Sequence, residues 1–599
     1  MIVADYIFKF FEEKGIRNVF MVVGGQAMFL DDAVYRNKNF TPIFTHHEQA
    51  AGMAAEAYGR LKNTPAVALV TAGPAGVNVL NGVVGGWVDS SPMIVISGQT
   101  NLSFVEYQEK TGIRQFGVQG INIGQLAEKV VKFFITIDDP KNILYYLQKA
   151  YYLSTTGRPG PVWLDVPLNI QGMAVPDGPL REFTEYAVQE SPKDIHAEVQ
   201  ETMRLLLQAK RPILLAGQGV RLGSAVEGFR EFVEKFRMPV LTARLAIDLI
   251  HSDHPLYVGR PGTYGERSAN FAVQNADLIL SVGCRLGTSL IGHDAKDFGR
   301  NAKKILVDID QKELDKPGLE KIAVVIHSTT KNFFQAALKE GEHAKMPDWE
   351  KWIAVCNGWK RAYPVVLPSY KEEKPVSSYY FTDRLSAVAT NDDWVLVDTG
   401  SCFHVACQTW KIKTGQRFLT TGGISTMGYW AAGIGACMAR DRKRIIVITG
   451  DGSLQMNLQE LATVKQNNLP LKIFIFNNNG YLLMRLMQSN FMDKRFMGES
   501  PATGLWCPDA LKIADTYGIR GIRIDSVEGI EEKITEALDC PGPVICDVMM
   551  PEWQILAPRT MSDKLPDGRL VARPYEDMYP FLDREELKRQ MVAELPEEF

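Results

Sequence analysis

Two neighbouring strand patterns in this chain end on oxygen-bearing residues that could hold a divalent cation. One apolar, β-branched run ends at Gly450 and Asp451, and the next ends at Asn478 and Gly480. Because the carboxyl ends of parallel strands form one crevice of an open sheet, we expect Asp451 and Asn478 to lie close together, despite the 27 positions (478 − 451) between them. The Asp451 carboxylate, the Asn478 amide oxygen and the Gly480 carbonyl are hard ligands, which suit Mg²⁺.

The turn after the first of these strands could also bind a phosphate. Gly450, Gly452 and Ser453 lead into a helical pattern over residues 454–466. Glycines let the backbone approach a diphosphate closely, and the first turn of a helix offers unpaired N–H groups to it. A lone Gly-Asp-Gly is also compatible with an ordinary strand–turn–helix junction in which the Asp caps the helix.

The elements that must position these residues alternate along the chain as strand and helix patterns. This alternation predicts an α/β fold in which parallel sheets carry helices on both faces. We place the domains at residues 1–170, 191–345 and 376–550. A polar linker is expected at 171–190, and a tail at 551–599 is expected to end in a helix from Arg584 to Leu595.

Composition excludes several classes of protein. The net charge of −4 gives no support for binding to nucleic acid or to an anionic membrane surface. No apolar run reaches the roughly 18 residues that a membrane-spanning helix needs, and the N-terminal pattern is not that of a secretion signal. Eight cysteines without a Cys-x-x-Cys pair predict reduced thiols and a cytoplasmic protein.

Taken together, the motifs resemble those of a known enzyme family. The Gly-Asp-Gly-Ser turn, the helix, the apolar strand and the Asn pair resemble the signature of thiamine diphosphate enzymes. Residues 45–60, reading THHEQAAGMAAEAYGR, and residues 422–429, reading GGISTMGY, resemble motifs of the acetolactate (acetohydroxyacid) synthase-like members. The resemblance covers nearly the whole chain and implies three doubly wound domains: pyrimidine-binding, central and diphosphate-binding. It also implies that Asp451, Asn478 and Gly480 bind the Mg²⁺ that holds the cofactor's diphosphate.

Glu48 is the first candidate for a catalytic residue. It follows a short strand and opens a helix rich in Ala and Gly, where the helix dipole alone would favour a carboxylate. The resemblance implies that Glu48 contacts the N1′ nitrogen of the cofactor's aminopyrimidine and relays a proton through the ring. It also points to Gln119, in the segment RQFGVQG, as a residue on the substrate side.

The resemblance assigns further residues to two cofactors. Thiamine diphosphate would contact Gly25, Gly73, Pro74, Asn78, Gly400, Ser401, Cys402, Met427, Gly450, Gly452 and Ser453. Met427 would be the apolar wedge that bends the cofactor, and Gly400-Ser401-Cys402 stand where the family has Gly-Gln-His. FAD would contact Gly217, Gly219, Arg285 and Asp308 in the central domain. Ser328 occupies a position that is acidic in the family, and related enzymes use this domain with another nucleotide or with none.

The implied activity is carboligation dependent on thiamine diphosphate. The protein would decarboxylate a 2-oxo acid, pyruvate in the simplest case, and transfer the two-carbon acetyl unit to a carbonyl acceptor. The synthases carry a Trp nine residues (487 − 478) after the metal-binding Asn, whereas this chain has Met487, which favours an acceptor larger than pyruvate. The tail resembles those of relatives in cell-surface sugar pathways, so one candidate acceptor is a CDP-4-keto-deoxysugar in branched-sugar biosynthesis.

Other activities are compatible with the same motifs. An acetolactate synthase would join two 2-oxo acids, a simple decarboxylase would release free aldehyde, and an acetyl-phosphate-forming transferase would depend on phosphate. A non-catalytic, flavin-bound scaffold is disfavoured by the intact Glu48, Asp451 and Asn478. Since Glu48 and Asp451 lie in different domains and in the family meet across a subunit interface, we expect a homodimer or homotetramer.

Overall fold

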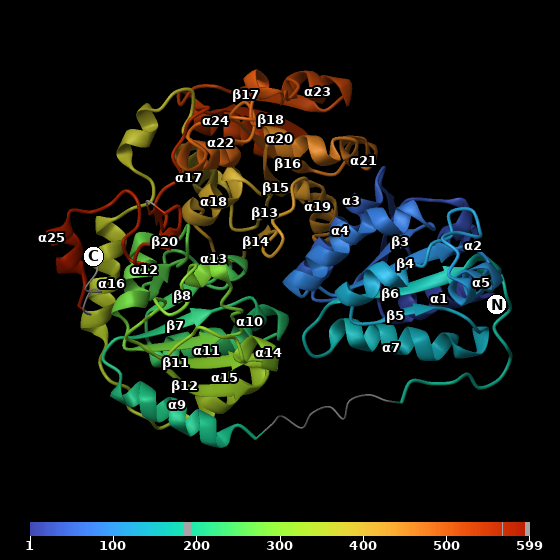
Figure 1. The fold of residues 1–599 in the computed structure, drawn as a ribbon, viewed down its shortest axis with the longest axis horizontal. Coiled ribbons are helices and arrows are strands. Elements are labelled where there is room, and N and C mark those ends of the chain that lie inside the picture. The colour runs from blue at the N-terminus through green and yellow to red at the C-terminus, as the bar shows by residue number, and fades with distance from the viewer. Residues whose placement is uncertain (185–193, 566, 593–599) are drawn as a thin grey trace.

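In the computed structural model, the chain folds into three parallel six-stranded sheets with flanking helices (Figure 1). The structure describes residues 1–184, 194–565 and 567–592. It confirms the predicted α/β fold with three parallel sheets. Residues 185–190 of the predicted linker and 593–595 of the predicted last helix lie outside the described residues, and the described part of that helix is α25 (Arg584–Gln590).

The N-terminal sheet lies at the blue end of the chain in Figure 1. Its strands are β1 (Asn18–Met21), β2 (Thr41–Phe44), β3 (Ala66–Val70), β4 (Met93–Gln99), β5 (Phe134–Thr136) and β6 (Pro161–Pro167). Its helices are α1 (Val3–Glu13), α2 (Met28–Arg36), α3 (Glu48–Lys62), α4 (Pro74–Asp89), α5 (Leu102–Thr111), α6 (Gly124–Ala127), α7 (Ile143–Thr155) and α8 (Leu168–Gln171). The strand order is β2-β1-β3-β4-β6-β5, so the chain changes direction across the sheet between β1 and β3 and leaves a ligand crevice there.

The central sheet has a different order. Its strands are β7 (Pro212–Ala216), β8 (Val240–Thr242), β9 (Tyr257–Gly259), β10 (Leu278–Val282), β11 (Lys303–Asp308) and β12 (Ile322–His327). Its helices are α9 (His196–Gln208), α10 (Gly219–Leu222), α11 (Val226–Phe236), α12 (Arg267–Asn275), α13 (Thr288–Ile291), α14 (Gln311–Leu314), α15 (Thr330–Glu340) and α16 (Glu350–Ala362). The order β9-β8-β7-β10-β11-β12 is that of dinucleotide-binding folds, with the switch point between β7 and β10.

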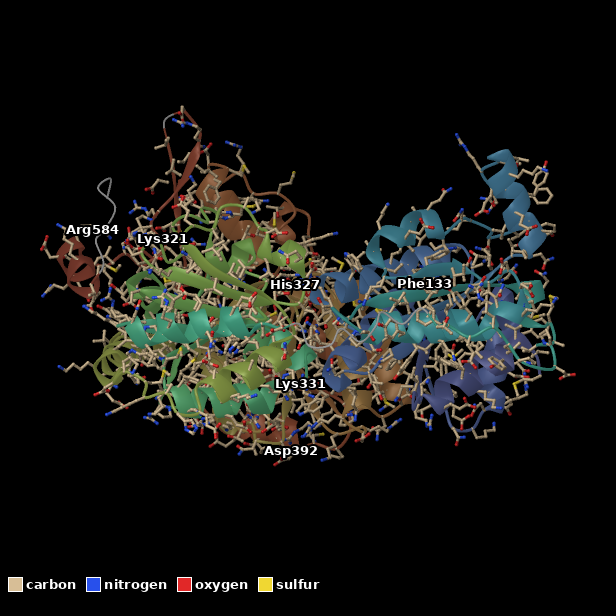
Figure 2. All side chains as sticks on the ribbon, turned by 90° about the horizontal axis from the view of Figure 1, so that it is seen from below. Phe133, Lys321, His327, Lys331, Asp392 and Arg584 are labelled. Atoms are coloured by element: carbon tan, nitrogen blue, oxygen red, sulfur yellow. The ribbon has the colours of Figure 1, made fainter. Side chains whose placement is uncertain are left out.

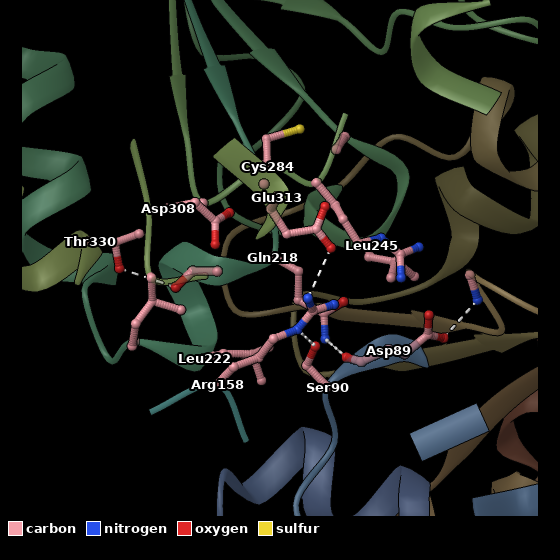
Figure 3. A pocket seen from close by; sticks show the side chains of 18 of the residues that line it. Asp89, Ser90, Arg158, Gln218, Leu222, Leu245, Cys284, Asp308, Glu313 and Thr330 are labelled. Atoms are coloured by element: carbon pink, nitrogen blue, oxygen red, sulfur yellow. Dashed lines mark hydrogen bonds and ion pairs between the residues drawn. The ribbon is translucent and has the colours of Figure 1, made fainter. Parts of the chain in front are cut away.

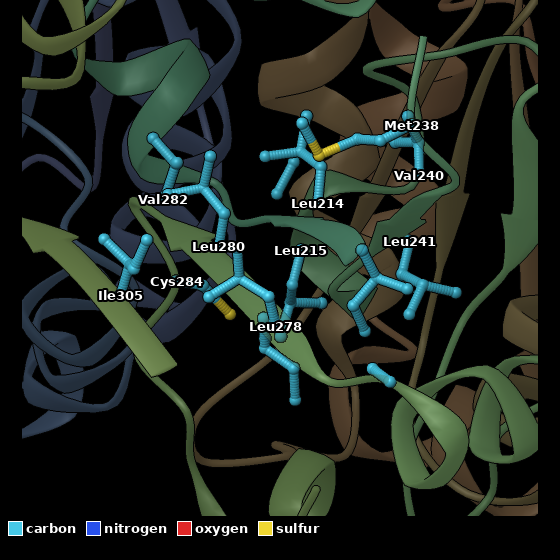
Figure 4. Packing of buried hydrophobic residues seen from close by; sticks show 14 of the residues in the cluster. Leu214, Leu215, Met238, Val240, Leu241, Leu278, Leu280, Val282, Cys284 and Ile305 are labelled. Atoms are coloured by element: carbon cyan, nitrogen blue, oxygen red, sulfur yellow. The ribbon is translucent and has the colours of Figure 1, made fainter. Parts of the chain in front are cut away.

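The core of the central domain follows from the composition of these strands. β7 and β10 are buried along their whole length and pair in parallel, with Leu278 opposite Pro212 and Val282 opposite Ala216. Figure 4 shows Leu214 and Leu280 from this pair among the packed side chains. Continuous apolar runs of this kind are typical of parallel strands covered on both faces.

The C-terminal sheet repeats the order of the N-terminal one. Its strands are β13 (Trp394–Val397), β14 (Arg417–Thr420), β15 (Ile445–Gly450), β16 (Leu471–Asn477), β17 (Arg520–Ile524) and β18 (Val544–Met549), in the order β14-β13-β15-β16-β18-β17. Its helices are α17 (Ser378–Val388), α18 (Ser401–Thr409), α19 (Ala432–Ala439), α20 (Asp451–Leu454), α21 (Glu460–Gln466), α22 (Leu482–Phe491), α23 (Ala510–Thr516) and α24 (Ile530–Asp539). The helix expected over residues 454–466 is divided by a 3₁₀ turn, where buried Asn457 donates from its side chain to the Gly428 carbonyl at 2.9 Å.

The N- and C-terminal domains share one core through α3 and α19. A Cβ on Gly435 of α19 would lie 1.9 Å from the Ala54 carbonyl of α3, so only glycine permits this helix contact. Beside it, buried Arg60 pairs with Glu56 at 3.0 Å and with Asp89 at 3.3 Å. Because these charges are buried, loss of one partner would leave an opposite charge buried without compensation.

Removing the Arg60 charge is expected to destabilise this contact. In Arg60→Met, Glu56 and Asp89 stay buried without a counter-charge, at a cost of about 3–5 kcal/mol. The midpoint of denaturant-induced unfolding should therefore fall clearly, while Arg204→Met, at a half-exposed arginine on α9, should leave it nearly unchanged. An unchanged midpoint in Arg60→Met would show that the network carries no net stabilisation.

The described part of the tail packs on the central domain and does not extend into solvent. The Tyr575 hydroxyl donates to the Leu290 carbonyl at 2.5 Å, and buried Glu576 pairs with Arg300 at 2.7 Å. Figure 2 shows Arg584 of the tail near one end of the molecule and Phe133 of the N-terminal domain in the other half. Within the described residues, no helix is both long and apolar enough to cross a membrane.

Candidate active site

The predicted metal ligands lie together at the carboxyl ends of β15 and β16, next to the switch point between β13 and β15. β15 and β16 pair in parallel with Gly450 opposite Phe476, which places the residues that follow side by side. Asp451 accepts the Gly480 N–H through Oδ2 at 2.8 Å. The Asn478 side-chain oxygen Oδ1 is buried and accepts no hydrogen bond from any residue that the structure describes. A buried amide oxygen without a donor is costly, so this oxygen is suited to a ligand.

The chemistry of this group fits a cation. Loss of hydration on burial raises the pKa of Asp451 to about 6, and no Lys or Arg forms an ion pair with it among the described residues. A carboxylate, an amide oxygen and the Gly480 carbonyl are hard ligands that leave room for phosphate oxygens on Mg²⁺. Among the described residues there is no cluster of three or more His, Cys, Asp or Glu side chains that could hold a metal ion by themselves.

The helix after β13 supplies backbone donors on the other side of the crevice. Gly400 has φ +89° and precedes α18, whose first residues are Ser401 and Cys402. Asn478 Nδ2 donates to Ser401 Oγ at 3.4 Å, which links this helix to the predicted metal loop. The buried Cys402 thiol donates to the Thr399 carbonyl at 3.0 Å. Cys402 therefore offers a ligand its backbone N–H, not its side chain.

The segment that contains Met427 is fixed from both sides. The N–H groups of Gly422 and Gly423 donate to Asp89 at 2.8 and 2.9 Å, and the N–H of Gly428 donates to Ser453 Oγ at 2.8 Å. Met427, between these anchors, is half-buried. The backbone that carries Met427, the apolar residue predicted to support the cofactor, is thus fixed by hydrogen bonds on both sides.

The second half of the predicted site lies at the carboxyl ends of β2 and β3. Glu48 opens α3, and Asn78 Nδ2 donates to its Oε2 at 3.0 Å. Gly73 has φ +64° and precedes Pro74 at the start of α4; a Cβ there would lie 2.5 Å from the Gln119 carbonyl. Gln119 itself is exposed in the loop that covers this turn, and Gly25 is exposed in the turn after β1.

A cavity of about 580 Å³ opens at the switch point of the central sheet (Figure 3). Gly217, Gly219, Arg285 and Asp308, the four predicted FAD contacts, all line it. Gly217 packs so closely that a Cβ would lie 2.0 Å from the Gly283 carbonyl. Burial raises the pKa of Asp308. The cavity therefore has the glycine turns and the acidic residue that a nucleotide site needs.

Comparisons with known proteins agree with this division of the chain. Residues 1–121, 199–336 and 398–548 match the N-terminal TPP binding, central and C-terminal TPP binding domains of thiamine pyrophosphate enzymes. The chain is 32% identical to the acetolactate synthase large subunit of Cyanidium caldarium, over 89% of this chain and 91% of the relative. It is 29% identical to the large subunit of acetolactate synthase isozyme 2 of Escherichia coli K12, over 94% and 98% of the two chains. The chain belongs to the acetolactate synthase-like thiamine pyrophosphate enzymes. It is thus a thiamine diphosphate-dependent enzyme of the carboligase kind.

In this thiamine pyrophosphate enzyme, Asp398 organises the diphosphate side of the site, although no sequence motif indicated it. It is fully buried and accepts hydrogen bonds from Ser453 Oγ at 2.7 Å and from Thr449 Oγ1 at 2.8 Å. It also accepts the N–H groups of Tyr429 and Trp430. Asp398 therefore connects three segments, and the available signal was its position directly after the apolar residues 394–397 and two residues before Gly400.

Arg485 is a second residue that the motifs did not reveal. It is buried on α22 and donates to the carbonyls of Asn478 at 3.2 Å and Asn479 at 3.0 Å. It also pairs with buried Glu499 at 2.5 Å. Arg485 thus holds the backbone of the predicted metal loop, although its own local sequence is that of an ordinary helix.

The two predicted half-sites of this thiamine pyrophosphate enzyme belong to different domains of the chain. Among the described residues, no hydrogen bond joins Glu48 to Asp451 or Asn478. These domains do contact each other elsewhere: the N–H of His46, in the turn before α3, donates to Glu460 of α21 at 3.1 Å.

Proposed function

We propose that this protein decarboxylates a 2-oxo acid, pyruvate in the first place, and joins the two-carbon unit to a carbonyl acceptor. The observation that carries the proposal is the buried, unpartnered Asn478 oxygen beside the Asp451 carboxylate in a chain of this family. Thiamine diphosphate, when bound, supplies the carbon nucleophile and the electron sink that such a decarboxylation needs.

The chain's own residues bind the cofactor and move a proton. Asp451, Asn478 and Gly480 would hold Mg²⁺, and the N–H groups at the start of α18 would receive the diphosphate. Met427 would support the organic part. Glu48 would hold a proton at its carboxylate, in an orientation fixed by Asn78. Enclosure of these groups excludes water from the reacting atoms.

We propose that a complete site forms between two copies of the chain, in a homodimer or homotetramer. Exposed apolar side chains accompany each half-site, and exposed apolar surface of this kind commonly marks an interface. Those near Glu48 and Gln119 are Val77, Phe104, Tyr107, Phe116 and Val118, and those near the metal loop are Met456, Met484, Met487, Met497, Trp506 and Trp553. The eight cysteines are free thiols, in keeping with the cytoplasmic location we propose.

Mixed assemblies of two inactive variants test this arrangement. If sites form between copies, co-production of Glu48→Gln and Asp451→Ala chains should restore activity, because one site in each mixed dimer receives an intact Glu48 and an intact Asp451. Each variant alone should stay inactive. Assemblies that are mixed by mass but still inactive would place both residues of a site in one chain.

We propose FAD as the occupant of the central cavity. The support is the strand order of the domain and the lining by Gly217, Gly219 and Asp308. Arg285 would contact FAD through its backbone, because its guanidinium donates to the Val88 carbonyl at 2.5 Å. The purified protein is expected to release a flavin on denaturation, and release of another nucleotide would replace FAD in this proposal.

Two acceptors fit the proposal. The relatives named acetolactate synthase favour a second 2-oxo acid. Met487 on α22, 39% exposed where the synthases carry Trp, favours a larger carbonyl compound such as a CDP-4-keto-deoxysugar. Mass spectrometry of products from pyruvate with each acceptor decides between them. Acetolactate alone supports the synthase, and a two-carbon mass gain on the sugar nucleotide supports the branching enzyme.

The variant Met487→Trp measures how far this side chain sets acceptor size. A Trp ring adds bulk at the same position, so kcat/KM for any acceptor larger than pyruvate should fall at least about tenfold. The value for pyruvate should hold or rise. Leu483→Met, one turn away on the same helix, is the matched control, and equal losses for small and large acceptors would remove Met487 from acceptor selection.

A further inference from the structure

Two arginines lie close to a Tyr–His pair where the central domain, the C-terminal domain and the tail meet, and we call this region, which borders the central cavity at Arg244, the recess. Arg244 follows β8, Tyr264 precedes α12, His404 belongs to α18 and Arg559 belongs to the tail. The Tyr264 and His404 rings stack with centroids 3.9 Å apart, and Arg559 Nη1 donates to the Tyr264 hydroxyl at 3.5 Å. The Arg244 guanidinium lies 5.1 Å from the centre of the Phe403 ring. Four segments distant in sequence thus converge on one small region.

Neither arginine of this recess has an anionic partner. In the described chain, Arg244 and Arg559 form no ion pair, and Arg244 donates no hydrogen bond. Arg244 Nη2 and Arg559 Nε are shielded from solvent without partners, as is His404 Nδ1. Elsewhere in the protein, the buried arginines Arg260 and Arg485 each pair with a glutamate. Shielded N–H groups without a partner are unfavourable, so these half-buried guanidinium groups are suited to an anionic ligand.

The groups nearest Arg244 do not supply the missing negative charge. They are two phenols, Tyr264 and Tyr575, and the Cys407 thiol. Burial raises the pKa of Cys407 to about 11 and the pKa of Tyr575 well above its usual value, so both are neutral. Burial, together with the positive charges of Arg244 and Arg559, lowers the pKa of His404 well below its usual value. The recess therefore carries a net positive charge that the chain itself does not balance.

The recess is continuous with the two sites already described. Arg244 and Phe403 line the central cavity. His404 lies three residues (404 − 401) after Ser401 on α18, and Ser401 contacts the metal loop through Asn478. A charged group held in the recess would therefore adjoin both the wall of the central cavity and helix α18, whose first residue contacts the predicted metal loop.

We propose that Arg244, Arg559 and Tyr264 bind an oxyanionic group of the acceptor substrate. The inference rests on the proposed carboligation. Guanidinium groups form paired, charge-assisted hydrogen bonds with carboxylates and phosphates alike. The shared chemistry is an oxyanion, which a 2-oxo acid presents as its carboxylate and a nucleotide sugar as its diphosphate.

Steady-state kinetics of the full chain, saturated with thiamine diphosphate and Mg²⁺, tests the recess. Arg244→Met removes the charge and keeps an apolar stem, so the KM for the acceptor should rise about tenfold or more, with a much smaller change in kcat. Arg559→Met should act in the same direction. Arg230→Met, at an exposed arginine on α11 that pairs only with Glu227, is the control and should keep both constants. The acceptors are 2-oxobutyrate and a CDP-keto-deoxysugar, and the arm whose KM rises identifies the carboxylate or the phosphate.

Calorimetry with inorganic phosphate separates this inference from the proposed function. Thiamine diphosphate already fills its own site, so added phosphate cannot bind there. A binding heat that the unaltered protein shows and Arg244→Met lacks would support anion binding in the recess, even if no acceptor is turned over. If Arg244→Met does not fold, Arg559→Met and Tyr264→Phe carry both measurements. Unaltered acceptor KM and phosphate binding in the folded variants would overturn the inference. So would loss of bound flavin alone, because the recess would then serve the nucleotide of the cavity.

Discussion

Turnover is expected to fall by about 10²–10⁴-fold in Glu48→Gln, while the protein still binds thiamine diphosphate. Gln keeps the shape of the side chain and can still contact the Asn78 amide, which lies 3.0 Å from Glu48 Oε2. It cannot exchange a proton as a carboxylate does. Product formation from pyruvate, measured beside equilibrium binding of the cofactor, gives the result.

The matched control is Glu128→Gln, which changes an exposed glutamate of the same domain. It should behave like the unaltered protein in both assays. Equal turnover in Glu48→Gln, with the cofactor bound, would remove Glu48 from the mechanism. Loss of binding together with turnover would instead give it a structural part in holding the cofactor.

In Asp451→Ala, the affinity for thiamine diphosphate at a fixed Mg²⁺ concentration should fall at least about hundredfold. Asp451 supplies the only carboxylate of the predicted ligand set, and the remaining oxygens of Asn478 and Gly480 are neutral. Isothermal titration of the cofactor, with and without Mg²⁺, measures the loss. Addition of excess Mg²⁺ should recover part of the affinity, because the binding of metal and diphosphate is coupled.

Asp539→Ala is the control for this experiment, since Asp539 is 74% exposed at the end of α24. It should bind the cofactor normally. Full affinity in Asp451→Ala would contradict the metal assignment. If circular dichroism shows that Asp451→Ala is unfolded, Asn478→Ala takes its place in the test, since the Asn478 side-chain oxygen has no hydrogen-bond partner among the described residues.

Local patterns predicted the parts of the site that depend on neighbouring strands. Asp451 and Gly480 are in contact because parallel strands bring their carboxyl ends to one edge. Glu48 and Asn78 also meet, but β1 separates the two strands that precede them, and only the family resemblance had assigned both to the cofactor. The alternation of strand and helix was also sufficient for the fold class, because buried parallel strands have a distinctive apolar composition.

Residues that act by long-range convergence could not be predicted in this way. Arg485 holds the metal loop and Arg244 lines the charged recess, yet each lies in a local sequence typical of an ordinary helix or loop. Arg559 reaches the recess only because the tail packs on the central domain. The pairing of such segments depends on tertiary packing, which no spacing of residues within one segment records.

Release of CO₂ from pyruvate by the purified chain, with thiamine diphosphate and Mg²⁺ each present or omitted, tests the central claim most directly. The account predicts sustained release only when both are present, with the two-carbon unit recovered on an acceptor, and loss of that release in Glu48→Gln. Release that persists without the cofactor, or no release from any 2-oxo acid by folded protein with the cofactor bound, would contradict it.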